Sequence, residues 1–295
     1  MNYSNREMKG NIMIVITGAN GQLGQLIVTE LLKTTPPASI VAAVRDPAKA
    51  AGLAGLGVQV RKADYNDPST LDAAFAGADK ILLISSSEVG QRLPQHRNVI
   101  EAAKRANAGL LAYTSLLHAD TSPLALAGEH KATEELLRAS GLRYSILRNG
   151  WYYENYTAGL GGALSHGVLL GSAQDGRVSA ATRADYAAAA VAVLNSASPE
   201  PLYELAGERS FSLPELAAEL SRQAGKEVPY KDLPEAEYKA VLLGAGLPDW
   251  LAALLSESDA GVAKGALEDN SGTLSRLIGR PTTPLSEAVR AALAK

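Results

Sequence analysis

The sequence predicts an α/β fold in which a doubly wound parallel sheet is joined to a smaller, mainly helical C-terminal lobe. Buried-strand runs alternate with segments of helical period over the first half of the chain, and a glycine-rich turn follows the first run. The alternation breaks after Arg148, where Pro and Gly punctuate a mostly helical pattern. Such alternation places crossover helices on both faces of a parallel sheet.

The predicted elements can be named in chain order. Strands are expected at 12–17, 40–44, 58–61, 80–85, 110–115 and 144–148, with helical spacing of apolar residues between them. A glycine-rich stretch at 159–176 precedes an alanine-rich helix near 185–194 and a strand at 202–205. Further helices are expected near 213–223, 234–244, 248–259 and 284–294. Residues 1–11 are polar and indicate a flexible leader, a tag remnant or an early start codon rather than a signal peptide.

Composition narrows the function classes. The 295 residues are 46% hydrophobic and 20% charged, which is typical of a globular protein with one large or two medium domains. The formal charge of -3, without a basic run, predicts no nucleic-acid partner. The lack of cysteine excludes disulfides and thiolate chemistry and suits a cytoplasmic protein. The longest apolar runs are much shorter than the ~20 residues of a membrane-spanning helix, so no membrane span is expected.

The glycine-rich turn predicts a dinucleotide site. It comprises Gly18, Ala19, Asn20, Gly21, Gln22, Leu23 and Gly24, directly after a strand and at the start of a helix. Residues without a Cβ let backbone N–H groups approach a pyrophosphate, and the helix N-terminus adds partial positive charge. Gly24 is expected to let the helix pack closely on the strand. The alternative is a purely structural turn.

Arg45, at the end of the second strand, indicates the choice of cofactor. It stands 21 positions after Gly24, where an acidic residue would favour NAD and a basic residue NADP. A guanidinium can bind a 2′-phosphate through two hydrogen bonds, so we expect NADPH. The alternative is a solvated arginine at a strand end, beside Asp46.

Polar residues also follow the third and fourth strands. Asp64 could accept a hydrogen bond from the adenine amino group, and Ser85, Ser86 and Ser87 could contact the riboses, because ligands bind at the carboxyl ends of parallel strands. Asp64 is equally explained as part of a helix N-terminus with Asp67.

The segment after the sixth strand contains four aromatic residues in eight positions: Trp151, Tyr152, Tyr153 and Tyr156. One or two of them are expected in the core. The rest could line a flat pocket for an aromatic substrate, because they leave a strand at the crevice. The four histidines are scattered without paired carboxylates at ligand spacing, so no metal site is predicted.

With these motifs, the chain resembles the atypical short-chain dehydrogenases of the NmrA-like branch, and within them the bacterial NADPH:quinone oxidoreductases. The residues that carry the resemblance are 17–24, 79–92 (DKILLISSSEVGQR), 113–123 (YTSLLHADTSP), 147–152 (LRNGWY), 182–186 (TRADY) and 277–281 (LIGRP). The resemblance implies a Rossmann-type fold and NADPH held by 18–23, Arg45 and 85–87. It also implies that a loop of Asn149, Gly150, Trp151, Tyr152, Tyr153 and Glu154 closes over the nicotinamide end.

The dinucleotide-binding domain is accordingly expected at 12–150 and about 178–207. A smaller substrate lobe is expected at about 151–177 and 208–295.

The chain departs from the short-chain dehydrogenase pattern at one place. Ser115 is present, but the comparable helix reads His130-Lys131-Ala132-Thr133-Glu134 instead of Tyr-x-x-x-Lys. Carbonyl reduction by that dyad is therefore not expected, whereas a quinone can take its proton from water. Glu134 could hold His130 as a weak proton donor, or the pair could be ordinary helix-surface polarity. We expect no indispensable catalytic side chain.

Three functions remain open from sequence. The first is NADPH-dependent reduction of quinones by hydride transfer. The second is a non-catalytic NADP-binding redox sensor of the NmrA type. The third is a reductase of another substrate, such as an azo or triphenylmethane dye or a sugar nucleotide. A homo-oligomer is possible.

Overall fold

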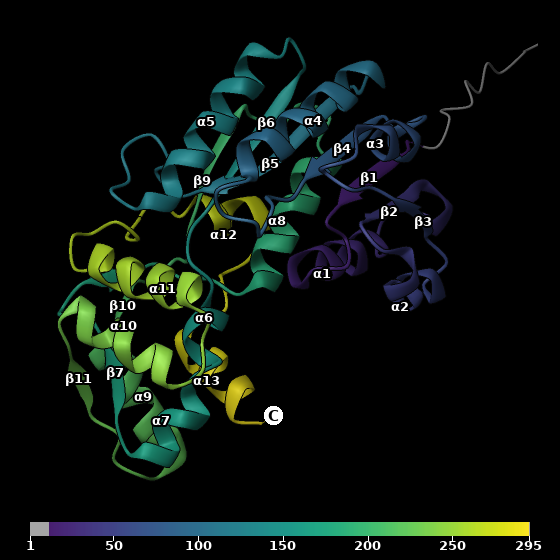
Figure 1. Cartoon of the computed structure of the whole chain (residues 1–295). Helices are drawn as coiled ribbons and strands as arrows, with labels where there is room; N and C mark the ends of the chain where they lie inside the picture. The colour runs from purple at the N-terminus through teal and green to yellow at the C-terminus, as the bar shows by residue number, and fades with distance from the viewer. Residues whose placement is uncertain (1–11, 295) are drawn as a thin grey trace, which may run out of the picture.

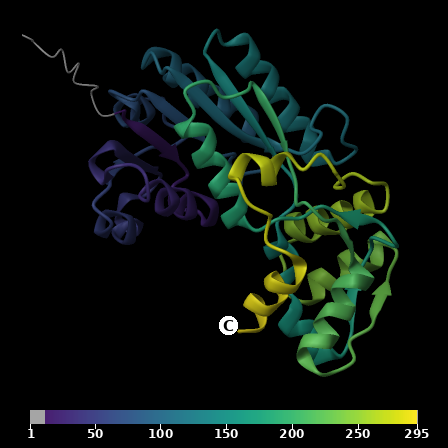
Figure 2. The ribbon, with the colours of Figure 1, turned by 180° about the vertical axis from the view of Figure 1, so that it is seen from behind.

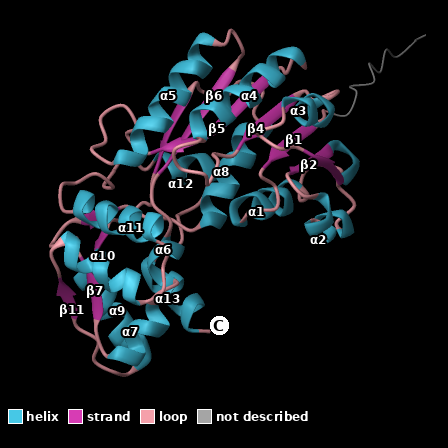
Figure 3. Cartoon of the chain, viewed as in Figure 1, coloured by secondary structure: helices cyan, strands magenta, loops and turns pink. Residues whose placement is uncertain are grey.

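The computed structural model describes residues 12–294, and the predicted leader at 1–11 lies outside them. Seven parallel strands form one sheet in the order β3-β2-β1-β4-β5-β6-β9 (Figure 3). Their bounds are β1 Ile14–Thr17, β2 Ile40–Val44, β3 Gln59–Lys62, β4 Lys80–Leu83, β5 Leu110–Leu116, β6 Tyr144–Asn149 and β9 Leu202–Leu205. The predicted fold class is confirmed.

The strand order contains one topological switch point. From β1 the chain proceeds outward to β2 and β3, then crosses back to β4 and continues in the opposite direction. Ile14 of β1 pairs with Ile40 of β2 and with Lys80 of β4, so these three strands run in step. The loops that leave the carboxyl ends of β1 and β4 therefore turn in opposite directions and open a crevice between them.

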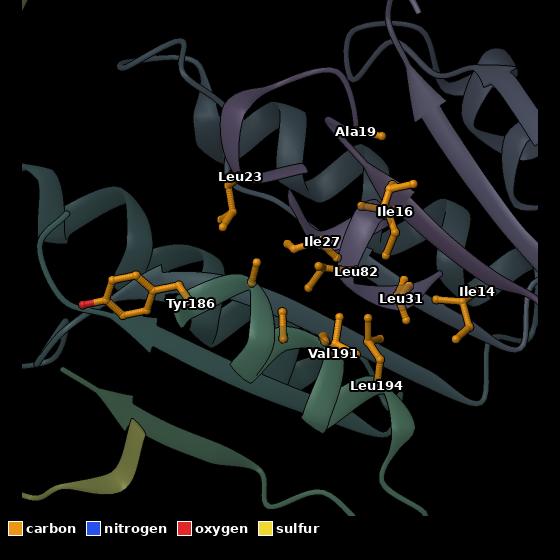
Figure 4. Packing of buried hydrophobic residues seen from close by; sticks show 14 of the residues in the cluster. Ile14, Ile16, Ala19, Leu23, Ile27, Leu31, Leu82, Tyr186, Val191 and Leu194 are labelled. Atoms are coloured by element: carbon orange, nitrogen blue, oxygen red, sulfur yellow. The ribbon is translucent and has the colours of Figure 1, made fainter. Parts of the chain in front are cut away.

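Helices cover both faces of the sheet (Figures 1 and 2). One face carries α3 (Pro68–Phe75), α4 (Arg92–Arg105) and α5 (Ala125–Ala139), and the other carries α1 (Gln22–Leu31), α8 (Arg183–Asn195) and α12 (Thr273–Ile278). The strands alternate accordingly, since Ile14 and Ile16 contribute to the core under α1 whereas Val15 faces the other core. Figure 4 shows the first core, in which α1 (Leu23, Ile27, Leu31) faces α8 (Tyr186, Val191, Leu194).

A second lobe with a core of its own lies at the lower left of Figure 1. Its helices are α6 (Tyr153–Thr157), α7 (Leu160–His166), α9 (Leu213–Ala224), α10 (Glu235–Gly244), α11 (Asp249–Val262) and α13 (Leu285–Leu293). It also contains two small sheets, β8 (Arg177–Val178) with β10 (Phe211–Ser212), and β7 (Leu169–Gly171) with β11 (Tyr230–Asp232). The domain bounds given above stay a prediction.

The structure adds elements that the sequence pattern did not reveal. The glycine-rich stretch contains α7 and β7, because the buried Leu160 and Ala163 anchor α7 in the second core. Tertiary packing there outweighs the low helix propensity of Gly161 and Gly162. Other short elements were also missed, namely α2 (Ala51–Gly55), α6, β8, β10, β11 and α12, which has glycines at both of its caps. None of the helices within residues 12–294 is long and apolar enough to cross a membrane.

Candidate functional site

A cavity of about 420 Å³ lies at the carboxyl ends of β1 to β4, at the switch point of the sheet. Its volume is in the range of small-molecule binding sites. It is lined by Gly18, Asn20, Gly21, Val44, Arg45, Asp46, Lys49, Ala63, Asp64, Tyr65, Asn66, Ile84, Ser85, Ser86, Ser87, Glu88 and Gln95. The structure thus brings together predicted residues from four separate strand ends.

The glycines of the turn have different roles. Gly18 has φ of +59°, a left-handed conformation that favours glycine, and it lies over the Tyr65 hydroxyl and Ile84. A Cβ on Gly24 would come within 2.5 Å of the Gly18 carbonyl oxygen and 2.7 Å of the Ala19 Cα. The prediction that Gly24 packs against the strand is therefore corrected, because its close contact is with the turn itself.

The N-terminus of α1 suits an anionic group. Gly21 is the N-cap residue, and within the described residues this helix end has no side-chain cap and no acidic residue in its first turn. The partial positive charge of this helix end therefore lies next to Gly21, a residue that lines the cavity, without a competing carboxylate in the first turn. The donor set fits the pyrophosphate of a dinucleotide.

The other predicted residues of the turn lie differently. Ala19 and Leu23 are buried in the core under α1, and Gln22 is exposed. Ala19, Gln22, Leu23 and Gly24 do not contribute to the lining of the cavity. Their assignment to cofactor binding stays a prediction that rests on main-chain groups.

Arg45 lies at the rim of the cavity, as predicted from its place at the end of β2. Its guanidinium Nη1 is 2.6 Å from Glu88 Oε1. Asp46 caps the short helix that follows by accepting a hydrogen bond from the Ala48 N–H at 3.1 Å. Lys49 also lines the cavity, with its Nζ 3.8 Å from Asp46 Oδ2, and it was missed from sequence although it stands one helical turn after Arg45.

The floor of the cavity links three strand ends through Tyr65. Thr17 of β1 and the Tyr65 hydroxyl are hydrogen-bonded at 2.5 Å, and Tyr65 donates to the Ile84 carbonyl at 2.8 Å. Burial raises the pKa of Tyr65, so its hydroxyl stays protonated and can make both contacts. Tyr65 therefore fixes the spacing between the glycine turn and the loop after β4.

Asp64 lies in the turn that precedes α3, where its side chain faces both that turn and the cavity. Its side chain accepts from the Asn66 N–H at 2.9 Å in the turn before α3, while Asp67 forms the N-cap of α3 by accepting from the Ser69 N–H. Asp64 also lines the cavity, where one carboxylate oxygen can accept from a ligand. Its contact with adenine stays a prediction.

The loop 85–87 is held by two buried side chains of α4. The Ser86 N–H donates to His96 Nε2 at 2.9 Å, and Arg92 Nε donates to the Ser86 carbonyl at 2.6 Å. Because His96 Nε2 accepts, its Nδ1 carries the proton toward Thr133 Oγ1, 2.9 Å away, and Thr133 donates onward to the Glu129 carbonyl. The N–H and the carbonyl of Ser86 are therefore both hydrogen-bonded, and these bonds hold the loop in place.

His96 is kept neutral in this arrangement. Burial, together with the neighbouring Arg92 guanidinium, lowers the pKa of His96 to about 3. A neutral ring is required, since a protonated Nε2 would face the Ser86 N–H donor. Arg92, Gln95 and His96 share one face of α4 and could have been found from their i, i+3, i+4 spacing.

Glu129 of α5 completes the support. Its carboxylate accepts from the Gly90 and Arg92 N–H groups, each at 3.1 Å. It thereby acts as the missing cap of α4, whose own N-cap residue Gln91 makes no side-chain capping bond. The loop after β4 is consequently anchored at both of its ends.

The aromatic segment divides between the two cores. Trp151 and Tyr153 are buried in the second core, where Tyr153 stacks on Phe211 with ring centroids 5.4 Å apart. Tyr152 is half-buried, and the Arg183 guanidinium lies 4.3 Å from the centre of its ring. Glu154 accepts from the Arg183 N–H at 2.9 Å. The expectation that one or two aromatic residues belong to the core agrees with this placement.

Residues 149–154 do not line the cavity described above. Asn149 is buried at the end of β6, and Gly150 is fixed by its N–H donating to the Leu205 carbonyl at 2.7 Å. A Cβ on Gly150 would meet the Tyr186 hydroxyl at 3.0 Å and the Leu205 oxygen at 3.1 Å, so the chain needs glycine there. Closure of this segment over the nicotinamide stays a prediction.

The proposed pairing of His130 with Glu134 is wrong. His130 is buried, with Nδ1 2.7 Å from the Tyr113 hydroxyl and Nε2 3.4 Å from Arg92. Burial and the Arg92 charge hold the pKa of His130 well below its usual value, so the ring is neutral at pH 7. The alternative of helix-surface polarity is also wrong, because His130 and Glu134 both face the sheet side of α5.

Glu134 instead belongs to a buried ion network. It accepts from Ser115 Oγ at 2.6 Å and from Arg148 at 2.8 Å (Nε) and 2.7 Å (Nη2). Arg148 Nη1 contacts Asp120 and Glu204 as well, and Arg138 contacts Glu134 from the surface. Burial acts to raise the pKa of Glu134, but the hydrogen bonds from Arg148 and Ser115 outweigh it and lower the pKa. The place of a proton-donating dyad is therefore taken by a structural ion pair.

No group of three or more His, Asp or Glu side chains is arranged to hold a metal ion in the part of the chain that the structure describes.

The chain matches the family model described as NAD(P)H-binding over residues 18–197. It is 58% identical to quinone oxidoreductase 2 of Escherichia coli over 94% of this chain and 97% of that protein. The crystal structure of that NADPH-dependent enzyme with NADPH superposes with a TM-score of 0.93, covering 95% of this chain and all of the other.

Two further relatives widen the comparison. The triphenylmethane reductase of Citrobacter, solved with NADP(H), is 37% identical with a TM-score of 0.92, covering 95% of this chain and 99% of the other. An NmrA-like family oxidoreductase of Aspergillus flavus is 28% identical over 94% of this chain and 93% of that protein. The chain therefore belongs to the NAD(P)H-binding family, in the NmrA-like branch that its motifs had indicated.

Proposed function

We propose that this protein reduces quinones with NADPH, by transfer of a hydride from the nicotinamide to the quinone. The observation that carries the proposal is the cavity at the switch point. It combines an uncapped helix N-terminus with Arg45 and Lys49 on the rim, and no acid–base dyad accompanies it in residues 12–294. Quinone oxidoreductase 2, at 58% identity, supports the substrate class.

Each part of the site has a task in this reaction. NADPH, when bound, supplies the hydride, which carries two electrons and one proton to the quinone. The α1 N-terminus and the Gly18–Gly21 turn bind the pyrophosphate, and Arg45 with Lys49 binds the 2′-phosphate. The fixed loop 85–87 orients the nucleoside, and water supplies the second proton. A stabilised, phenolate-type oxygen needs no strong acid to accept that proton.

The test is oxidation of NADPH followed at 340 nm with and without 1,4-benzoquinone. We expect turnover that depends on the quinone, and a product with two electrons added per NADPH consumed. NADPH binding without oxidation by any quinone or dye would contradict the proposal and would favour the redox sensor. A second candidate function is reduction of dyes, which the 37% identical triphenylmethane reductase supports. Faster turnover of a triphenylmethane dye than of benzoquinone would favour it.

Replacing Arg45 by alanine is expected to remove most of the preference for NADPH over NADH. The wild-type protein should bind NADPH at least tenfold tighter, about 1.4 kcal/mol, because only NADPH has the 2′-phosphate that a guanidinium can bind. Calorimetric titration of both cofactors into both proteins measures the two ratios. Equal affinities in the wild-type protein would contradict the assignment of Arg45.

Replacing Ser115 by alanine, or His130 by glutamine, is expected to leave turnover within tenfold of wild type. Ser115 Oγ is committed to Glu134, and His130 is neutral and bonded to Tyr113, so neither delivers the proton. A true general acid typically contributes a factor of ~10² to 10⁴. Steady-state kcat, measured at a temperature where the variants are folded, decides. A thousandfold fall for either variant would identify a proton donor.

Other predictions from sequence remain open. The roles of residues 149–154, the domain bounds, a homo-oligomeric state and a cytoplasmic location stay predictions. Among them, contact of residues 149–154 with nicotinamide and quinone is part of the proposal, because the half-buried ring of Tyr152 lies beside Arg183 at the N-terminus of α8.

A further inference from the structure

The cations that line the cavity are both already paired with carboxylates. Arg45 Nη1 lies 2.6 Å from Glu88 Oε1, and Lys49 Nζ lies 3.8 Å from Asp46 Oδ2. A 2′-phosphate that binds at this rim therefore meets positive groups whose charge is partly neutralised by the protein itself.

The Arg45–Glu88 pair crosses the mouth of the cavity. Arg45 follows β2 and Glu88 follows β4, and these strands lie on either side of β1. The ion pair therefore spans the space beyond the carboxyl end of β1, where the glycine turn begins. Side chains from two separate loops meet over the cavity and close its rim.

Glu88 is held in place to make this contact. Its other oxygen accepts from Gln95 Nε2 at 2.7 Å, and Gln95 is a buried residue of α4. The Glu88 N–H donates to Ser86 Oγ at 3.1 Å, and Ser86 is itself fixed by His96 and Arg92. The hydrogen bond from Gln95, then that from Arg45, lowers the pKa of Glu88, so the carboxylate is charged at neutral pH.

We propose that Glu88 is a specificity-determining residue, an internal competitor of the cofactor's 2′-phosphate for the Arg45 guanidinium. Binding of a 2′-phosphorylated nucleotide replaces the Glu88–Arg45 contact by a phosphate–Arg45 contact. A nucleotide with a free 2′-hydroxyl leaves the pair intact. Glu88 thus weakens NADPH binding selectively and narrows the preference over NADH. This inference rests on the proposed NADPH site.

The size of the effect follows from exposure. The side chains of Arg45 and Glu88 are 69% and 41% exposed, so the pair is a partly solvated one and not a buried one. Exposed pairs contribute the equivalent of roughly a two- to fivefold change in an equilibrium constant, and salt screens them. The competition is therefore of a size that tunes cofactor choice without abolishing binding.

The test compares Glu88→Gln with the wild-type protein by calorimetric titration of 2′,5′-ADP and of 5′-AMP, which differ in the 2′-phosphate. We expect 2′,5′-ADP to bind roughly two- to fivefold tighter to Glu88→Gln and 5′-AMP to bind equally to both. The gain should shrink as salt rises. Glu101→Gln is the matched control, because it removes a carboxylate from an exposed Lys104 pair on α4, and it should change neither affinity.

The same titrations in an Arg45→Ala background show whether Glu88 acts through Arg45. We expect the gain from Glu88→Gln to disappear there. An equal gain would mean direct repulsion of the phosphate and would overturn the proposal, as would unchanged 2′,5′-ADP affinity in Glu88→Gln. If the wild-type protein binds 2′,5′-ADP no tighter than 5′-AMP, both the Glu88 proposal and the assignment of NADPH as cofactor fail. The other negative outcomes overturn the Glu88 proposal alone and do not contradict quinone reduction by NADPH.

Discussion

Replacing Gly21 by valine is expected to raise the Kd for NADPH at least a hundredfold in a protein that still folds. Gly21 has an extended backbone with φ of -74°, which valine adopts readily, and its Cβ would lie 3.2 Å from the Gly18 oxygen. The branched side chain would occupy the space in front of the α1 N-terminus. Loss of two charge-assisted hydrogen bonds, at roughly 1.5 to 3 kcal/mol each, accounts for this factor.

The measurement is titration with NADPH, beside far-ultraviolet circular dichroism to establish the fold. Gly128→Val is a matched control, because Gly128 lies on the exposed side of α5 with open space around it. That variant should bind NADPH as the wild-type protein does. Undiminished affinity in folded Gly21→Val would remove the pyrophosphate from this turn.

Replacing Glu134 by alanine is expected to lower the free energy of unfolding by about 3 kcal/mol, a fall in Tm of roughly 6 to 12 °C. The carboxylate is fully buried, and its loss leaves Arg148 without its bidentate partner and Ser115 without an acceptor. Arg148 keeps its contacts with Asp120 and Glu204. The expected loss of unfolding free energy is therefore at the lower end of the range for a broken buried ion pair.

Thermal and urea unfolding measure this effect. Glu135→Ala is the control, because Glu135 is exposed on the next position of α5 and should change the free energy of unfolding by less than about 0.5 kcal/mol. Turnover per folded molecule of Glu134→Ala should remain near that of wild type. A stable Glu134→Ala variant that has lost activity would return this position to the catalytic machinery.

Local sequence patterns predicted most of the sheet. All six strands expected at 12–17, 40–44, 58–61, 80–85, 110–115 and 144–148 begin within two residues of the observed start, and the strands Ile40–Val44 and Leu202–Leu205 match at both ends. This success has a physical reason, since a parallel strand buried on both faces must be a short, nearly continuous apolar run. The place of the glycine turn and of Arg45 beside the cavity could also be predicted, because both directly follow the end of a strand.

Contacts between side chains that are far apart in the sequence could not be predicted. Nothing in the local sequence placed Glu88 against Arg45, 43 positions away, or Glu134 against Arg148. The i, i+4 spacing of His130 and Glu134 predicted a pair. In the structure the sheet under α5 provides their partners instead: Tyr113 binds His130, and Ser115 and Arg148 bind Glu134. Partners offered by a neighbouring strand outweigh those along a helix when the face is buried.

The sequence by itself determined that a parallel sheet carries a dinucleotide turn, because strand burial, helix period and glycine spacing are encoded within a few neighbouring residues. Only the tertiary structure decided which charges meet at the cavity. The order of the strands brings the ends of β2 and β4 to either side of β1, and so turns Arg45 and Glu88 into one ion pair over the site. Electrostatic interactions act over distance in space, and no local pattern of residues records that distance.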